Sequence, residues 1–194
     1  MLELGAWLEI AKSAALKGGK YLLKNQGKEL KILLNQGRDI KLQLDTDTEQ
    51  LIKNSLSSQS AFSILGEETG FSDDVGEFYW VVDPLDGTSN FLRDIPISCV
   101  SIALMQNKTP ILGVIYDFNH DDLYYGHLES KAFVNQMEIT VSNYAEKSES
   151  TLVTGIPAKT NYSDNEFKQM IADFQQWKKV RMIGSAAMAS IYVA

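Results

Sequence analysis

The sequence predicts a layered protein of mixed α and β structure, with helices packed against a largely antiparallel sheet. Two apolar runs, residues 61–65 and 78–82, have the length of strands, and each ends in acidic residues. A series of further apolar runs joined by short polar turns occupies residues 97–134, as expected for an antiparallel sheet. Strand and helix patterns mix without a strict β-α-β rhythm, which argues against a doubly wound parallel sheet.

The most informative stretch runs from Phe78 to Phe91 and reads F-Y-W-V-V-D-P-L-D-G-T-S-N-F. Its apolar beginning, residues 78–82, is typical of a strand buried on both faces, and we expect this strand to end at Asp83. Asp86 and Gly87 form a turn pair, and the polar residues after the glycine are good helix caps. A strand that brings two carboxylates, a tight turn and a helix start to one place is suited to bind a metal and a phosphate.

Two helices are expected near the start of the chain. Apolar residues recur at helical spacing over residues 4–22, and this amphipathic helix should end near Asn25-Gln26-Gly27. Thr46 and Glu49 have the spacing of a capping box, which predicts that a second helix starts there. Asp45 is then expected just before that helix.

The remaining elements follow from shorter patterns. Apolar runs bounded by turn residues predict strands, and a longer run of helical period predicts a helix. In chain order these are strands at 30–34 and 40–44 around a turn at 35–37, strands at 97–105, 111–118, 123–126, 131–134 and 151–154, a helix at 164–178, a strand at 180–183 and a final helix at 185–193.

Composition excludes several classes of function. With 194 residues, 44% of them hydrophobic, the chain can bury a sizeable core. The formal net charge of -7 argues against a nucleic acid polymer as partner and suits cations. The single cysteine, Cys99, rules out a disulfide framework and indicates a reducing, cytoplasmic setting. Neither a signal peptide nor a membrane span is visible, so we expect no membrane partner.

The acidic residues have a common chemistry. Glu67 and Glu68 follow one strand, Asp83 and Asp86 follow the other, and all are hard oxygen ligands. Bringing several carboxylates together costs repulsion unless cations neutralise them. Mg²⁺ is the natural candidate because it takes one or two carboxylates, keeps waters and completes its shell with phosphate oxygens. The backbone N–H groups of residues 87–89, at a helix start, could bind such a phosphate.

These segments, in order and spacing, resemble the signature segments of the inositol monophosphatase family of magnesium-dependent, lithium-sensitive phosphatases. The matching segments are G-E-E-T-G at 66–70, W-V-V-D-P-L-D-G-T-S-N-F at 80–91, G-S-A-A at 184–187 and, more weakly, D-x5-D-x3-E at 39–49 and A-F-V-N-Q-M-E-I-T-V-S at 132–142. The resemblance covers nearly the whole chain. The Walker A pattern and the G-x-G-x-x-G fingerprint are absent.

The resemblance implies alternating helix and sheet layers of the inositol monophosphatase and sugar phosphatase type. It implies one domain over residues 1–194, with an N-terminal α+β portion at about 1–150 and the start of a C-terminal α/β portion at about 151–194. The family's later W-D-x-A-A-G segment, whose Asp binds the second metal, has no counterpart here. We therefore expect a C-terminally truncated form of the fold.

The resemblance also assigns metal ligands. Glu67 matches the carboxylate that binds the first metal, and Asp83 the one that bridges metals. The carbonyl group of Leu85 matches a further ligand of the first metal, and Asp86 a ligand of the second. Two or three Mg²⁺ ions per site are implied.

The same comparison of motifs assigns catalytic and substrate residues. Thr88 is expected to pair with Asp45 to orient and activate the attacking water, with Glu67 as the third catalytic residue. The amides of Gly87 and Thr88 match the phosphate-binding groups. The substrate's alcohol part is expected to contact Asp86 and the loop residues Gly184, Ser185 and Ala186.

The implied function is Mg²⁺-dependent hydrolysis of a small phosphate monoester of a polyol or sugar, most simply inositol 1-phosphate. Fructose 1,6-bisphosphate and 3′-phosphoadenosine 5′-phosphate are alternative substrates within the same chemistry. An alternative of another class is a catalytically incomplete module that binds metal and phosphate without turnover. A cytoplasmic homodimer is the expected form.

Overall fold

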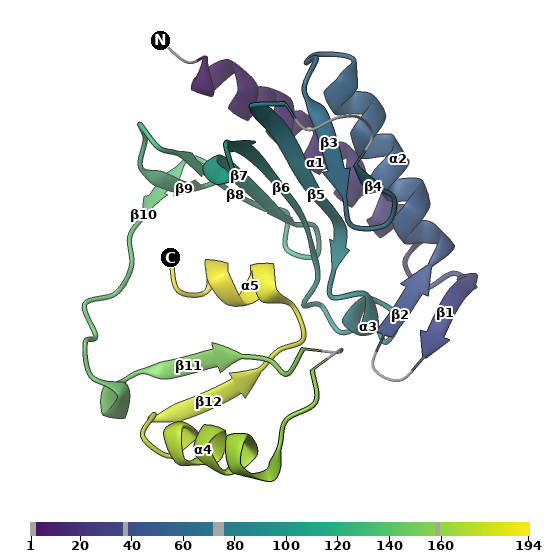
Figure 1. Cartoon of the computed structure of the whole chain (residues 1–194). Helices are drawn as coiled ribbons and strands as arrows, with labels where there is room; N and C mark the ends of the chain where they lie inside the picture. The colour runs from purple at the N-terminus through teal and green to yellow at the C-terminus, as the bar shows by residue number, and fades with distance from the viewer. Residues whose placement is uncertain (1–2, 37–38, 72–75, 158–159) are drawn as a thin grey trace.

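The computed structural model describes residues 3–36, 39–71, 76–157 and 160–194. Its centre is an eight-stranded sheet with the order β10-β9-β8-β7-β6-β5-β3-β4 (Figure 1). In chain order the strands are β3 (Ser63–Gly66), β4 (Gly70–Phe71), β5 (Phe78–Asp86), β6 (Cys99–Gln106), β7 (Thr109–Asp117), β8 (Asp122–His127), β9 (Ala132–Val134) and β10 (Met137–Ile139).

Neighbouring strands of this sheet run antiparallel except for β3 and β5, which are parallel. The largely antiparallel sheet predicted from the sequence is therefore confirmed, and with it the mixed α and β layers. The short edge strands β4 and β10 were not predicted, because two or three residues are too few to show an alternating pattern.

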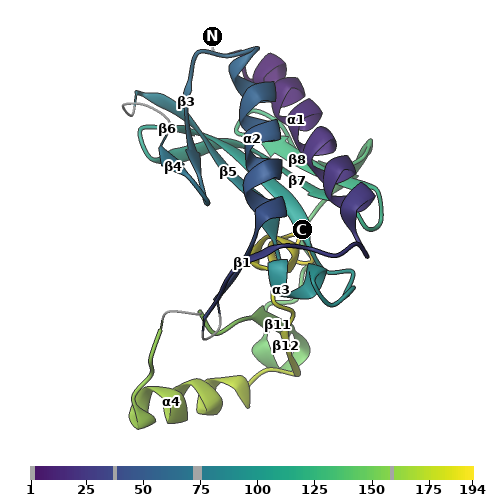
Figure 2. The same cartoon turned by 90° about the vertical axis from the view of Figure 1, so that its right-hand side faces the viewer.

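Helices cover both faces of the sheet. Helices α1 (Leu4–Asn25) and α2 (Gln43–Ser57) lie side by side on one face, and α5 (Ala186–Ile191) lies on the other (Figures 1 and 2). Alternation along β6 explains the two cores: Val100 and Ile102 join the large core under α1 and α2, whereas Cys99 packs with Met188 of α5. Among the described residues, no helix has the length and apolar character that a membrane span requires.

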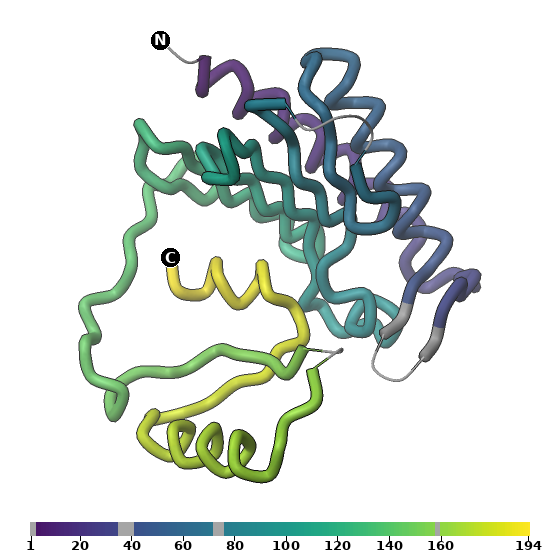
Figure 3. Tube along the Cα trace, in the orientation of Figure 1, coloured from purple at the N-terminus to yellow at the C-terminus, as the bar shows by residue number. Residues whose placement is uncertain are grey.

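Two smaller sheets accompany the central one. Strands β1 (Ile32–Gln36) and β2 (Asp39–Leu42) form the predicted antiparallel hairpin before α2, but with other bounds. Asn35 and Gln36 of the predicted turn belong to β1, residues 43–44 of the predicted second strand belong to α2, and Gly37 lies outside the described residues. Strands β11 (Thr151–Thr154) and β12 (Lys179–Met182) are parallel, and α4 (Asp164–Phe174) connects them. A segment with the 3₁₀ turn Lys147–Glu149 leads from the central sheet to this unit (Figure 3). The division of the chain near residue 150 stays a prediction.

Two predicted boundaries near the acidic residues are wrong. Strand β5 does not end at Asp83 but continues through Asp86, with an irregularity in its pairing to β6 between these two residues. Helix α2 begins at Gln43, so Asp45 lies inside its first turn instead of before it. The backbone N–H of Leu42 donates to Asp45 at 2.9 Å, and this carboxylate, not a Thr46–Glu49 capping box, serves the helix start.

Helix α4 also differs from its prediction. It ends at Phe174, four residues before the expected position of 178. Its apolar face is not buried within the described residues, since Phe167 is 46% exposed and Ile171 41% exposed. Helical period alone predicted the helix correctly, but it could not show whether a neighbouring element covers this face.

Candidate active site

The parallel pair β3 and β5 places two acidic residues beside each other. Gly66 pairs with Val82, and each is followed directly by a carboxylate residue, Glu67 and Asp83. The N–H of Glu67 donates to the Val82 carbonyl at 3.0 Å, which continues the pairing by one step. Because the two strands run in the same direction, the residues that follow this pair lie next to each other, and the two carboxylates come together.

The side chains of Glu67 and Asp83 lie within hydrogen-bonding reach of each other. Burial, followed by repulsion from Glu67 and Asp86, raises the pKa of Asp83 well above its ordinary value. Burial likewise raises the pKa of Glu67, and its interaction with Asp83 opposes that rise. A divalent cation would stabilise this pair, because it offsets both negative charges at once.

The D-P-L-D segment folds back on itself after Asp83. Asp83 Oδ1 accepts from the N–H of Leu85 at 3.1 Å. The buried Leu85 turns its carbonyl to the Thr88 hydroxyl, which donates to it at 3.1 Å. The carbonyl expected to bind a metal thus lies in the same turn as the carboxylates.

Gly87 makes the turn into the short helix α3 (Thr88–Phe91). Its φ of 95° is in the left-handed region, where side chains are strained. A Cβ at this position would come within 2.7 Å of the Ile97 carbonyl oxygen. Only glycine fits this position. The turn that it makes places the backbone of Gly87 and Thr88 at the start of the helix.

Asp45 reaches the same region from α2. Its Oδ2 accepts from Leu42, whereas its Oδ1 is buried and has no hydrogen-bond partner. Burial, with repulsion from Glu68 and Glu67, raises the pKa of Asp45 to about 7. The predicted pairing of Asp45 with Thr88 is not made by a hydrogen bond here, since the Thr88 hydroxyl is bonded to Leu85.

A lysine that sequence reasoning missed lies among these acids. Lys41 Nζ is 2.9 Å from Glu68 Oε2, and the Glu68 side chain is only 8% exposed. The positive charge of Lys41 opposes the rise of the pKa of both Asp45 and Glu67. Lys41 precedes Asp45 by four positions and belongs to no motif, so only the structure shows where it lies.

Asp86 is held by residues from the far end of the sequence. Its Oδ2 accepts from the Ser185 hydroxyl at 2.7 Å and from the Ala187 N–H at 2.6 Å. Ser185 also caps α5, because its Oγ accepts from the Met188 N–H at 3.2 Å. The structure therefore brings the predicted substrate loop, which includes Ala186 as the first residue of α5, against the predicted second-metal ligand.

Asn90 makes a second link between these segments and was not predicted as a site residue. Its Nδ2 donates to the Ile97 carbonyl at 2.8 Å and to the Ile183 carbonyl at 2.7 Å. Gly184 follows with a φ of 75°, and a Cβ there would lie 3.2 Å from the Asn90 amide. The N of the D-G-T-S-N-F motif was the signal that could have identified it.

The donor set fits magnesium. Within the described residues, no three His, Cys, Asp or Glu side chains lie close enough to surround an ion. Mg²⁺ does not need such a group, because it takes one or two carboxylates and completes its octahedron with carbonyl, water and phosphate oxygens. Glu67, Asp83 and the carbonyl of Leu85 could supply such oxygens. Asp45 Oδ1, which has no hydrogen-bond partner among the described residues, is a further acceptor.

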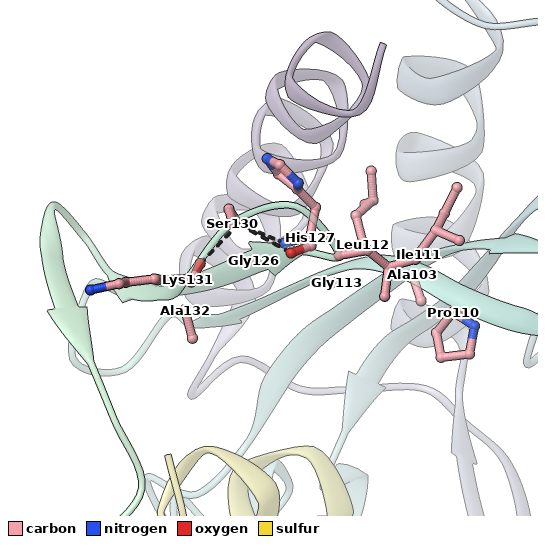
Figure 4. A pocket seen from close by; sticks show the side chains of 11 residues that line it. Ala103, Pro110, Ile111, Leu112, Gly113, Gly126, His127, Ser130, Lys131 and Ala132 are labelled. Carbon is pink, nitrogen blue, oxygen red and sulfur yellow. Dashed lines mark hydrogen bonds between the residues drawn. The ribbon is translucent and has the colours of Figure 1, made fainter. Parts of the chain in front are cut away.

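A pocket of about 340 Å³ lies elsewhere on the sheet (Figure 4). Small residues at paired positions of β6, β7 and β8 line it, namely Ala103, Gly113 and Gly126. None of the predicted site residues is among its lining residues. We therefore place the site at Glu67, Asp83 and Asp86, which we call the acidic edge, and not in this pocket.

Acidic side chains on neighbouring parallel strands, followed by a glycine turn and a helix start, are typical of proteins that bind metal ions and phosphate esters. The chain belongs to the inositol monophosphatase family, whose model matches residues 3–194. This is a family of phosphatases that act on small phosphorylated substrates and are generally metal-dependent.

Individual relatives agree with this membership. The "Fructose-1,6-bisphosphatase/inositol-1-monophosphatase" of Aquifex aeolicus is 32% identical, over 100% of this chain and 75% of its own length. The crystal structure of the extragenic suppressor protein suhB from Bartonella henselae has a TM-score of 0.86 and 31% identity, covering 97% of this chain and 74% of that one. The inositol monophosphatase from Anabaena gives a TM-score of 0.84 and 33% identity, covering 99% of this chain and 72% of that one.

Proposed function

We propose that this chain hydrolyses small phosphate monoesters with the help of Mg²⁺, most simply inositol 1-phosphate to inositol and phosphate. The observation that carries the proposal is the pair Glu67–Asp83, two carboxylates that follow paired residues of the parallel strands β3 and β5. Two carboxylates brought together in this way suit a cation, because a cation removes the repulsion that raises their pKa. Family membership supports the phosphatase class.

The acidic residues have distinct roles in this proposal. When bound, Mg²⁺ supplies charge neutralisation for the phosphoryl group and acidifies a water. Glu67, Asp83 and the carbonyl of Leu85 would hold the first ion, and Asp83 and Asp86 would hold the second. The backbone of Gly87 and Thr88 contacts the phosphate. The number of Mg²⁺ ions, two or three per site, stays a prediction.

Asp45 is proposed as the proton acceptor. Its pKa of about 7 suits this role, because a general base works best when its pKa lies near the working pH. Thr88 would relay the proton to the unpartnered oxygen of Asp45. This requires the Thr88 hydroxyl to rotate away from the Leu85 carbonyl, which it contacts here.

The segment Gly184–Ala186 is proposed to contact the alcohol part of the substrate, because Ser185 lies against Asp86 at 2.7 Å. Fructose 1,6-bisphosphate is the first alternative substrate, supported by the name of the Aquifex relative. 3′-Phosphoadenosine 5′-phosphate is the second. Inhibition by lithium, a homodimeric state and a cytoplasmic location are proposed from the family resemblance.

The test is phosphate release from these three substrates with and without Mg²⁺. We expect release from at least one of them only when Mg²⁺ is present. Asp83→Asn should remove at least about 99% of the activity, because a ligand charge shared by both ions is lost, while the thermal unfolding curve stays cooperative. Release that persists in Asp83→Asn would show that the metal assignment is wrong.

A second candidate is binding of metal and phosphate without turnover. It is favoured by one observation: Asp86, the proposed ligand of the second ion, is already engaged with α5. Titration calorimetry with Mg²⁺ and inorganic phosphate, run beside the activity assay, separates the two candidates. Binding with no phosphate release supports the second, and turnover by this chain excludes it.

A further inference from the structure

Glu49 is a buried carboxylate next to the acidic edge that has no assigned role. It lies on α2, four residues after Asp45, and is 0% exposed. A charged side chain is rarely buried to this degree unless it makes specific bonds. Its partners therefore indicate what it does.

Those partners are all in or beside the turn that carries Glu67. Glu49 Oε2 accepts from the N–H of Glu68 at 2.8 Å, and Oε1 accepts from the Thr69 hydroxyl at 2.5 Å. Lys53, one helical turn further along α2, lies 3.9 Å from Oε1 and donates to the Thr69 hydroxyl at 2.8 Å. A helix side chain and a turn are thus joined by charge-assisted bonds.

The Glu49 carboxyl group also packs closely against the backbone at Gly66. A Cβ on Gly66 would lie 2.3 Å from the Glu49 carboxyl group, so only glycine lets Glu49 reach the turn. On the other side, the N–H of Glu67 is bonded to the Val82 carbonyl. The peptides before and after Glu67 are therefore held by different elements, β5 and α2.

We infer that Glu49 is a positioning residue that fixes the Glu67–Glu68 turn and thereby holds the Glu67 carboxylate beside Asp83 for Mg²⁺. The inference rests on the proposed function. It also explains why one helix carries both acids: α2 presents Asp45 directly and sets Glu67 through Glu49. The distance between the proposed base and the proposed ligand is then determined by a single rigid element.

The length of the side chain, not its charge, is the property to test. Glu49→Asp keeps the charge but is one methylene too short to reach the Glu68 N–H. Glu49→Gln keeps the length and one acceptor oxygen for that N–H. Thr69→Val removes the bonds of the Thr69 hydroxyl to Glu49 and Lys53 but keeps the bond from the Glu68 N–H to Glu49, and it serves as the matched control.

Titration calorimetry with MgCl₂ alone measures the effect without substrate. We expect Glu49→Asp to weaken Mg²⁺ binding by about 10-fold or more, as is usual when a partner that orients a metal ligand is lost. Glu49→Gln and Thr69→Val should stay within about 3-fold of the wild type. In activity assays, Glu49→Asp should raise the Mg²⁺ concentration needed for half-maximal rate while kcat at saturating Mg²⁺ recovers to within about 3-fold.

Leu56→Ala separates positioning from general loss of stability. Leu56 is buried in the large apolar core on the same helix, seven residues after Glu49, so this variant should melt earlier with unchanged Mg²⁺ affinity. Wild-type affinity in folded Glu49→Asp overturns the inference while leaving the proposed function intact. No Mg²⁺ binding by the wild type overturns both.

Hydrogen exchange gives a readout that needs no variant. In the wild type, the amide of Glu68 should be protected to a degree similar to that of Glu67, because each donates to a fixed acceptor. A Glu68 amide that exchanges as fast as those of exposed turns would overturn the inference, even if Glu49→Asp does not fold.

Discussion

Asp86 accepts a 2.7 Å hydrogen bond from the Ser185 hydroxyl across 99 positions of the sequence. The same serine caps α5, so one side chain connects the acidic motif to the start of the last helix. The link makes the geometry of Asp86 depend on where α5 lies. It also gives the acidic edge a contact that local sequence could not supply.

Ser185→Ala should destabilise the chain through both of these bonds. Loss of a helix cap costs about 0.5–2 kcal/mol, and the carboxylate of Asp86 loses a donor as well. For a chain of this size each kcal/mol corresponds to roughly 2–4 °C, so a fall of several degrees in Tm is expected. Thermal unfolding followed by circular dichroism measures it.

The matched control is Ser163→Ala. Ser163 caps α4 in the same way, with the Glu166 N–H at 3.4 Å, and the carboxylate that it bonds is that of Glu166 on its own helix, not one of the candidate site. We expect a smaller fall in Tm and unchanged Mg²⁺ affinity for Ser163→Ala, whereas Ser185→Ala changes the affinity. Equal Mg²⁺ affinities in the two variants would show that the Ser185 bond does not influence Asp86.

Gly87→Ala should be strongly destabilising. A residue other than glycine at a φ of 95° costs about 1–3 kcal/mol, and the added Cβ would meet the Ile97 carbonyl oxygen at 2.7 Å. Urea unfolding should give a loss of at least about 2 kcal/mol. In contrast, Gly113→Ala adds a Cβ where no atom lies within 4 Å, and should change stability by no more than about 1 kcal/mol. Similar losses for the two variants would contradict the turn assignment.

Asp45 makes the metal-free protein less stable as pH rises. Its pKa of about 7 in the fold exceeds the value of about 3.9 in an unfolded chain. The folded state therefore holds the proton more tightly, and the resulting stabilisation is fully present below about pH 4 and is lost as pH rises through about 7. Asp45→Asn is neutral at every pH, so its Tm in EDTA should fall less between pH 5 and pH 8 than that of the wild type.

Asp173→Asn is the control for this pH series. The hydrogen bond from Lys147 to Asp173 lowers the pKa of this carboxyl group. Removing the Asp173 carboxylate should therefore not reduce the fall in Tm toward high pH. Parallel pH slopes for Asp45→Asn and the wild type would show that Asp45 stays charged in the fold. Added Mg²⁺ should raise the wild-type Tm most at pH 8, because an ion bound only by the folded state stabilises it.

Asn90→Ala should loosen the contact between the acidic motif and the segment before α5. Two carbonyl groups, those of Ile97 and Ile183, lose their donor, which we expect to cost about 1–3 kcal/mol in urea unfolding. Gln50→Ala removes a surface hydrogen bond to Asn54 and should stay within about 0.5 kcal/mol of the wild type. A loss no larger than that of Gln50→Ala would show that the Asn90 bonds contribute little.

Much of the fold could be predicted because its signals are local. The spacing of apolar residues identified α1 to within a residue or two at each end, and β11 at 151–154 coincides with its prediction. The wrong start of α2 has a tertiary cause. Glu49 looked like a capping residue of α2, but tertiary contacts with Glu68 and Thr69 use it instead.

At the acidic edge, too, the sequence predicted some of the contacts and not others. The sequence places acids directly after two apolar runs, and parallel pairing of β3 with β5 makes Glu67 and Asp83 neighbours. No pattern indicated Lys41 beside Glu68. The motif contains Asn90, but nothing in it indicated the bonds of Asn90 to two carbonyl groups. These contacts join residues whose spacing in sequence carries no periodic signal. The assigned roles of the site residues stay predictions that the variants above test.

The sequence by itself determined the family, the layered fold and the candidate ligands, because motifs and periodicities are properties of neighbouring residues. Only the tertiary structure decided which acids lie beside each other, which one α5 holds and which carboxylate supports the Glu67 turn. The physical reason is that burial and hydrogen bonding set the charge and direction of each carboxylate. Both arise from segments that meet only when the chain folds.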